Sequence, residues 1–306
     1  MTNKYDRRTK PFGNAFAVRD SNVLAILNTT FETTEAIDDE NLHLNFLKNY
    51  IKWISTTKNN YILGLENYQY ACFSNGTTES FDKFYCKYNK KRFRFFKGEY
   101  LYHRLSCRNH NLNWAYIEDD QLRDNDVVII SLPFSDTGNM HEQMHSVLKI
   151  CNTLEIPVLI DCAYFGVCNG ISFDFSYKCI KEITFSLSKS LYSAHLRIGM
   201  RLSRVDDDDP LFVTNKIGYV NRLSAYIGNR LIENFNPDYI YNKYSDRQKE
   251  ICSILKVKPS NSVLFGVGGN DWNEYNRDRH TNRLSFHKFL HHSNLDEIRK
   301  IANEKR

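Results

Sequence analysis

A lysine set among serines is the residue of this sequence best suited to covalent chemistry. Lys189 lies in the stretch FSLSKS (185–190), and Arg197 follows it by eight residues. If the lysine stands just beyond a strand end, partial burial and a nearby cation lower the pKa of its amine. The amine is then a nucleophile able to form a Schiff base. The alternative is a surface lysine in a loop, with Arg197 on an unrelated face.

A carboxylate ends the apolar run IPVLID (156–161). Asp161 closes this run, and Tyr164 follows three residues later. Ligands of open α/β sheets bind at the carboxyl ends of the strands, which is where Asp161 would lie. A buried carboxylate there needs a cationic partner, and a protonated ring nitrogen would serve. The alternative role of Asp161 is to cap the N-terminus of a helix.

The stretch SNGTTE (74–79) lies between an apolar, aromatic segment and a helical pattern. Glycine and hydroxyl residues that open a helix can hold a phosphate, because unpaired backbone N–H groups and the helix dipole point at the anion. The alternative is an ordinary capping box, with Glu79 as its acidic member.

An arginine stands in a strand-like run near the C-terminus, NRLSF (282–286). The guanidinium group of Arg283 could bind a carboxylate through two parallel hydrogen bonds. The alternative is a member of a surface ion pair.

Three apolar runs rich in β-branched residues must position these groups: 126–131, 156–161 and 181–186. A helical pattern at about 141–154 separates the first two, as a parallel sheet covered on both faces requires. We therefore expect an α/β fold with a large domain over 46–225, a mainly parallel sheet between helices. A smaller α+β domain is expected over 226–306. Residues 1–45 should form an N-terminal arm and part of the small domain.

The composition is that of a folded protein with a substantial core. The 306 residues are 42% hydrophobic and 25% charged, with a formal net charge of +5. This excess is too small to indicate a nucleic-acid or membrane binder. No apolar run approaches the length of a membrane span, and no secretory signal is expected. Eight cysteines without a CxxC pair predict reduced, mostly buried thiols, no structural metal and a cytoplasmic location.

The basic and aromatic stretch KKRFRFFK (90–97) could suggest single-stranded nucleic-acid binding. A strand of the large sheet with one solvated end explains the pattern equally well, and we favour this structural interpretation.

The order of the motifs is more specific than any one of them. The series NGTT, LPFSDTG, IDCAY, SLSK, Arg197 and RLSF, from Tyr70 to Phe286, resembles the fold type I aminotransferases of classes I and II. This is the aspartate aminotransferase-like superfamily, whose members use pyridoxal 5′-phosphate (PLP). The resemblance implies a PLP cofactor and an active site at the interface of a homodimer.

The resemblance also implies a role for each site residue. Lys189 would form the internal aldimine with PLP and move a proton between the substrate α-carbon and the cofactor. Asp161 would pair with the pyridine nitrogen, and Tyr164 would hydrogen-bond the phenolate oxygen. The cofactor's phosphate would be bound by Asn75, Gly76, Thr77, Ser186 and Arg197.

Three further positions match the family. Tyr100 would stack on the cofactor ring, and Arg283 would hold the substrate's α-carboxylate. Ser135 stands where the family has an asparagine, and its shorter side chain could donate one hydrogen bond to the phenolate oxygen.

The implied reaction moves an amino group from an amino acid to a 2-oxo acid or another carbonyl acceptor. Other reactions of the same cofactor stay open, namely β-elimination, decarboxylation, racemisation and cyclisation, as does a non-catalytic binding module. The expected partners are small-molecule substrates, with neither nucleic acid nor membrane.

Overall fold

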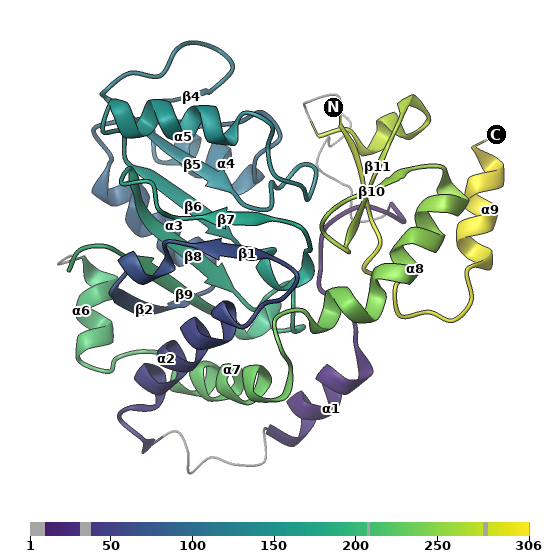
Figure 1. Ribbon diagram of the computed structural model, residues 1–306, viewed down its shortest axis with the longest axis horizontal. Helices are drawn as coiled ribbons and strands as arrows, with labels where there is room; N and C mark the ends of the chain where they lie inside the picture. The colour runs from purple at the N-terminus through teal and green to yellow at the C-terminus, as the bar shows by residue number, and fades with distance from the viewer. Residues whose placement is uncertain (1–9, 31–37, 207–208, 278–280, 306) are drawn as a thin grey trace.

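A computed structural model describes residues 10–30, 38–206, 209–277 and 281–305. Figure 1 shows a large sheet with its helices on the left and a small sheet with two helices on the right. The large part contains the strands β2 (Tyr70–Asn75), β3 (Arg92–Phe95), β4 (Trp114–Tyr116), β5 (Asp126–Ser131), β6 (Val158–Cys162), β8 (Ile180–Ser186) and β9 (Ile198–Ser203). Its helices are α2 (Leu42–Ser55), α3 (Thr77–Lys87), α4 (Leu101–Asn109), α5 (Met144–Thr153), α6 (Pro210–Lys216) and α7 (Arg222–Asn234).

The large sheet is mainly parallel, as the sequence predicts. In the described residues its strands run in the order β2-β9-β8-β6-β5-β3-β4. The neighbours from β8 to β4 are all parallel, and only β9 runs antiparallel to both of its neighbours. The predicted helix at about 141–154 is α5, which begins three residues later.

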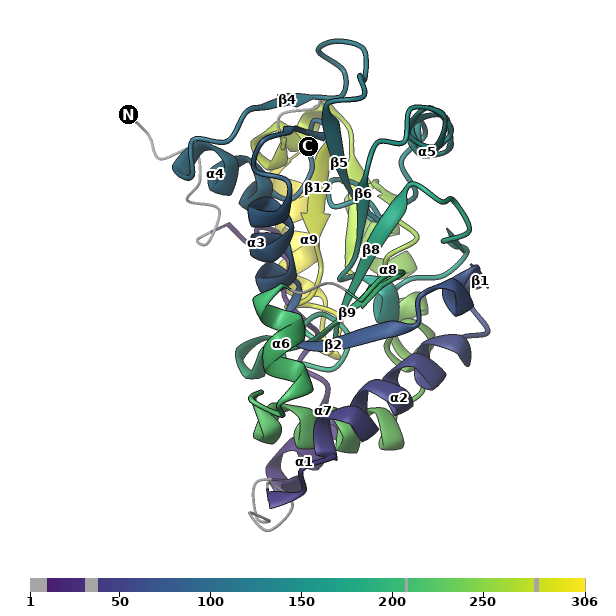
Figure 2. The ribbon, with the colours of Figure 1, turned by 90° about the vertical axis from the view of Figure 1, so that its left-hand side faces the viewer.

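Both faces of this sheet are covered, because side chains of the buried strands alternate between two helical layers. On β5, Val127 and Ile129 pack with side chains of α3 and α4. Val128 and Ile130 point the other way, into the core shared with α2, α5 and α7. Figure 2 shows α3 and α4 on one side of the sheet and α5 on the other.

The small part is an antiparallel sheet of β10 (Lys258–Pro259), β11 (Phe265–Gly268) and β12 (Asn282–Ser285), packed with α8 (Tyr239–Leu255) and α9 (Asp296–Glu304). The arm joins it, since Ser285 N donates to the carbonyl of Phe12 at 2.9 Å. A separate parallel pair is formed by β1 (Tyr61–Leu63) and β7 (Ser172–Asp174). Short 3-10 helices occur at η2 (Leu65–Asn67), η3 (Phe165–Val167), η4 (Ala194–Leu196) and η5 (Asn270–Tyr275).

The arm holds a helix that the sequence pattern does not reveal, α1 (Ser21–Thr30). Asp20 accepts hydrogen bonds from the backbone N–H groups of Asn22 and Val23 at 2.9 and 3.0 Å. Its carboxylate is buried and is also held by Tyr244, which donates at 2.6 Å, and by Lys243. The helix start is therefore fixed by partners more than 200 residues away in the sequence.

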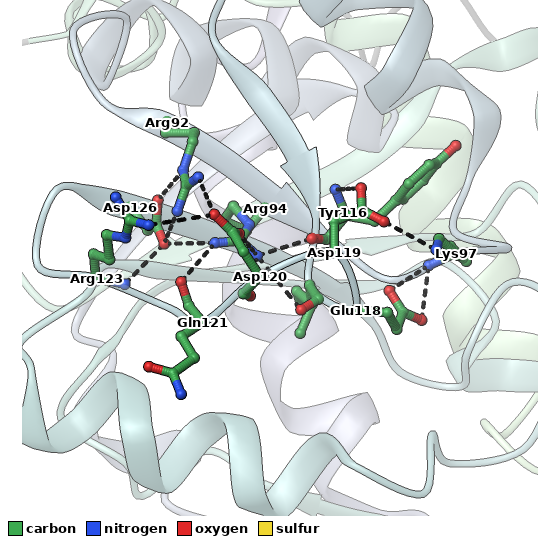
Figure 3. Close-up of polar contacts among 11 residues, drawn as sticks. Arg92, Arg94, Lys97, Tyr116, Glu118, Asp119, Asp120, Gln121, Arg123 and Asp126 are labelled. Carbon is green, nitrogen blue, oxygen red and sulfur yellow. Dashed lines mark hydrogen bonds and ion pairs between the residues drawn. The ribbon is translucent and has the colours of Figure 1, made fainter.

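The basic and aromatic stretch at 90–97 contains β3, which confirms the structural interpretation. Its arginines are not solvated, however. Arg94 is fully buried and pairs with Asp126 at 2.8 Å and Asp120 at 2.7 Å, while Arg92 pairs with the other oxygen of Asp126 at 2.6 Å (Figure 3). These carboxylates neutralise the charges of Arg92 and Arg94.

In the described residues the cysteines carry no disulfide, and all except Cys86 are buried. None of the helices there combines the length and the apolar character needed to cross a bilayer.

Candidate active site

The carboxyl ends of the parallel strands meet at one edge of the large sheet, facing the small part. Ser131 at the end of β5 is in register with Asp161 on β6, which is in register with Thr184 on β8. A cavity of about 410 Å³ opens there, lined by residues of the arm, of the large part and of the small part. Nine of the predicted residues line it: Thr77, Tyr100, Ser135, Asp161, Tyr164, Ser186, Lys189, Arg197 and Arg283.

Lys189 follows β8 by three residues and extends into the cavity. Its Nζ donates a hydrogen bond to the carbonyl oxygen of Ala15 and lies 5.6 Å from the ring centre of Phe16. Burial lowers the pKa of the Lys189 amine to about 8, and the charges of Arg283 and Arg197 act in the same direction. A substantial fraction of the amine is therefore uncharged, and nucleophilic, near neutral pH.

Asp161 is buried at the end of β6. The backbone N–H of Ala163 donates to its Oδ1 at 3.1 Å, and the hydroxyl of Thr184 donates at 3.4 Å. Burial, followed by the nearby charge of Glu99, raises the pKa of Asp161 to about 7. This carboxyl thus lacks a cation sufficient to offset its burial.

Arg197 and the start of α3 form an anion site. Gly76 precedes α3 with φ +74°, and a Cβ at this position would lie 2.2 Å from Nη2 of Arg197. The same Nη2 donates to the carbonyl of Asn75 and to the hydroxyl of Thr78, both at 3.0 Å. The guanidinium group is thereby held beside the first N–H groups of a helix, which favour an anion.

Two residues of the predicted phosphate site do not line the cavity. Gly76 is buried against the guanidinium group of Arg197, whereas Asn75 is exposed. The backbone N–H of Asn75 and its side-chain amide both donate to Glu79, at 2.6 and 3.1 Å. The capping interaction weighed in the sequence therefore exists alongside the anion site.

The ring and carboxylate candidates surround the rest of the cavity. Tyr100, at the start of α4, is 41% exposed, so a face of its ring is accessible to a ligand. Tyr164 packs edge-on against Phe265, with ring centres 5.3 Å apart. Arg283 donates to the carbonyl of Ser135 and lies 4.3 Å from the ring centre of Phe265.

Three charged lining residues escaped the sequence analysis: Glu99, Arg104 and Arg277. Glu99 is buried beside Asp161 and accepts hydrogen bonds from the backbone N–H and hydroxyl of Ser131. Its pKa is raised, chiefly by burial. Arg277 lies 3.6 Å from Asp136. The sequence offered one signal for Glu99, which is its position next to the candidate ring-stacking residue Tyr100. No motif in the sequence marks Arg277 as a site residue.

The described residues contain no group of three or more histidines, cysteines or carboxylates placed to bind a metal ion.

Comparison with solved structures identifies the fold of this chain. No protein-family model and no curated protein matches the sequence. Among solved structures, the histidinol-phosphate aminotransferase from Clostridium acetobutylicum is similar, with a TM-score of 0.63 and 14% identity over 96% of this chain and 99% of that one. The L-threonine-O-3-phosphate decarboxylase from Porphyromonas gingivalis has a TM-score of 0.67 and 13% identity, over 96% and 98% of the two chains. A PLP-bound C-S lyase from Staphylococcus hominis has a TM-score of 0.65 and 11% identity, over 96% of this chain and 86% of that one. The chain therefore has the fold of the fold type I, PLP-dependent aminotransferases, as its motif order predicts.

Proposed function

We propose that this protein binds PLP and acts as an aminotransferase that moves an amino group from an amino acid to a 2-oxo acid or another carbonyl compound. The observation that carries the proposal is the convergence on one cavity of an amine, a carboxyl and two guanidinium groups from β6, the connection between β8 and β9, and β12: Asp161, Lys189, Arg197 and Arg283.

The residues present fit this cofactor. The Arg197 site, with the N-terminus of α3, suits a phosphate. Asp161 has a raised pKa because its burial is not offset, and a protonated pyridine nitrogen is a cation that would offset it. The half-exposed ring of Tyr100 can stack on a flat heteroaromatic ring. Lys189 supplies an amine of lowered pKa for the aldehyde.

When bound, PLP supplies an aldehyde that accepts amines and a ring that withdraws electrons from the substrate's α-carbon. Lys189 would hold the aldehyde through its amine, and the same amine would move the proton at the substrate's α-carbon. Asp161 would pair with the protonated ring nitrogen. Arg283 orients the amino acid by its α-carboxylate, with two parallel hydrogen bonds.

The first test is chemical. The protein is incubated with PLP, reduced with borohydride and digested, and mass spectrometry locates the modified lysine. We expect the adduct on Lys189, its loss in Lys189→Ala, and its retention in Lys300→Ala, a control at an exposed lysine of α9. An amino acid and a 2-oxo acid should then yield the exchanged pair. An adduct elsewhere, or steady-state turnover by Lys189→Ala, would contradict the proposal.

A second candidate keeps PLP but changes the reaction to elimination or decarboxylation. It is supported by the decarboxylase and the C-S lyase among the similar structures. Product analysis separates the candidates, since elimination releases ammonia and decarboxylation releases carbon dioxide, in both cases without an aminated acceptor.

The homodimer implied by the sequence resemblance stays a prediction. Sedimentation of the PLP-loaded protein tests it.

A further inference from the structure

A second cavity, of about 700 Å³, adjoins the active-site cavity. It is formed by the arm, the loop after Lys189 and the segment after β12. Phe16 and Ala194 line both cavities. The second cavity is therefore separated from the active site by the side chain of Phe16, which is 47% exposed.

Among the ionisable groups of its lining, basic and imidazole side chains outnumber acidic ones. The cationic side chains are those of Arg19 and Lys288, and the imidazoles are those of His195, His287, His291 and His292. Glu297 is the acidic residue of the described lining. Within the described chain, no carboxylate forms an ion pair with Arg19 or Lys288. Both charges are therefore available to a ligand.

A short row of side chains lies between the two cavities. Nζ of Lys189 lies 5.6 Å from the ring centre of Phe16, and the other neighbour of this ring is His287, with ring centres 5.3 Å apart. His287 is buried and its Nδ1 lies 3.1 Å from the hydroxyl of Ser285, two residues after Arg283. The ring of Phe16 thus lies between the amine of Lys189 and the imidazole of His287 in the basic cavity.

The backbone around these groups is held in place. Arg19 directly precedes Asp20, whose buried carboxylate caps α1 and binds Tyr244 and Lys243. His287 follows β12 and is anchored by Ser285. A ligand would therefore meet one anchored imidazole, that of His287, beside exposed cationic side chains.

We propose that this basic cavity binds an oxyanion, a phosphate or a carboxylate, carried by the substrate at the end opposite its α-amino group. The inference rests on the proposed function. PLP and the α-carboxylate bound by Arg283 would occupy the 410 Å³ cavity, so a longer substrate must extend past Phe16. There it meets the guanidinium group of Arg19 and the ammonium group of Lys288, which bind oxyanions by charge-assisted hydrogen bonds, and imidazole N–H groups that can add further hydrogen bonds.

The first arm of the test measures binding and needs no turnover. The PLP-loaded protein is titrated with inorganic phosphate, and the histidine ring C–H signals are followed by NMR. We expect saturable shifts at His287 and His291. Arg19→Ala and Lys288→Ala should each weaken phosphate binding by about tenfold, as loss of one charge-assisted contact implies. Lys300→Ala, on exposed α9, should change it by less than about twofold. If these histidine signals do not shift, or if the control weakens binding as much as the variants, the inference is wrong.

The second arm identifies the source of the oxyanion. The kcat/KM of wild type is compared for O-phosphoserine, aspartate and alanine as amino donors, and for the corresponding 2-oxo acids as acceptors. We expect Lys288→Ala to lower kcat/KM for an anionic substrate by about tenfold while that for alanine stays the same. The substrate class with the larger loss, phosphate or carboxylate, names the natural group. Equal losses for alanine and the anionic substrates would overturn the inference.

The two proposals can fail separately. If PLP forms no adduct but phosphate still shifts His287 and His291, the oxyanion site stands and the aminotransferase proposal falls. If PLP forms its adduct on Lys189 but the histidine signals stay unchanged, the cofactor proposal stands and the oxyanion site falls.

Discussion

The guanidinium group of Arg197 lies in the space that a side chain at Gly76 would occupy. An ideal Cβ on Gly76 would stand 2.2 Å from Nη2 of Arg197. The contact is set by strand pairing, because Asn75 on β2 is in register with Ile198 on β9. The anion site therefore depends on glycine at position 76.

Gly76→Ala should reduce PLP affinity by at least about tenfold. The φ of +74° already disfavours a side chain there, and the new methyl group would displace Arg197. A PLP titration followed by absorbance measures the loss. Gly269→Ala is the control, because nothing lies within 4 Å of its Cβ. Equal affinity in the two variants would show that Arg197 does not hold the cofactor.

Asp161→Asn should stabilise the protein without cofactor at alkaline pH. The folded pKa of about 7 lies above the ordinary value of 3.8, so the carboxyl favours folding when protonated. That contribution is complete below pH 3.8 and is lost as the pH rises through 7. Since asparagine carries no charge to bury, the variant should gain on the order of 4 kcal/mol over wild type at pH 9 and little at pH 4.

Urea unfolding at several pH values measures this difference. Asp296→Asn is the control, since hydrogen bonds from Asn294 and Arg299 lower the pKa of Asp296 and its ionised form is the favoured one. This control should gain nothing at high pH. Parallel stability curves for wild type and Asp161→Asn would contradict the prediction. The variant should also lose turnover, because it cannot pair with a protonated ring nitrogen.

Arg283→Lys should raise the KM for amino-acid donors by about tenfold or more with a smaller change in kcat. Lysine keeps the charge but cannot bind a carboxylate through two parallel hydrogen bonds. Steady-state kinetics with a fixed acceptor measures both constants, and Arg299→Lys on exposed α9 serves as control. A fall in kcat at unchanged KM would indicate that Arg283 does not bind the ground-state substrate.

Arg94→Met should destabilise the protein by about 3 kcal/mol, because it leaves buried Asp126 short of one cation. Arg123→Met is the matched control: its side chain is 69% exposed and lies 3.7 Å from Asp120. The control should lose at most about 0.5 kcal/mol. Urea denaturation compares the two free energies of unfolding. Similar losses in both variants would mean that the buried pair in Figure 3 contributes no more than a surface pair.

The sequence predicts the central strands well, because their signal is local. β5 coincides with the predicted run 126–131, and β8 begins one residue earlier than predicted. Buried parallel strands need continuous apolar, β-branched runs, and such runs can be recognised in the sequence without knowing which strands they pair with. The positions of Lys189 and Asp161 can be predicted for the same reason, because Asp161 ends one such run and Lys189 follows another.

Other features depend on contacts between distant segments. α1 begins where Asp20 meets Tyr244, a pair separated by 224 residues. Burial raises the pKa of Glu99, and the hydrogen bonds from Ser131 oppose this effect. Arg19 and Lys288 line one cavity only because the arm packs beside the segment after β12.

The sequence by itself therefore determined the class of fold, the order of the buried strands along the chain and the residue types at their ends. Only the tertiary structure decided which of these residues share a cavity, and which long-range partners surround them. The physical reason is that apolar periodicity is a property of residues that are neighbours in the sequence. The burial of a group and its distance from other charges are set only when distant segments pack together.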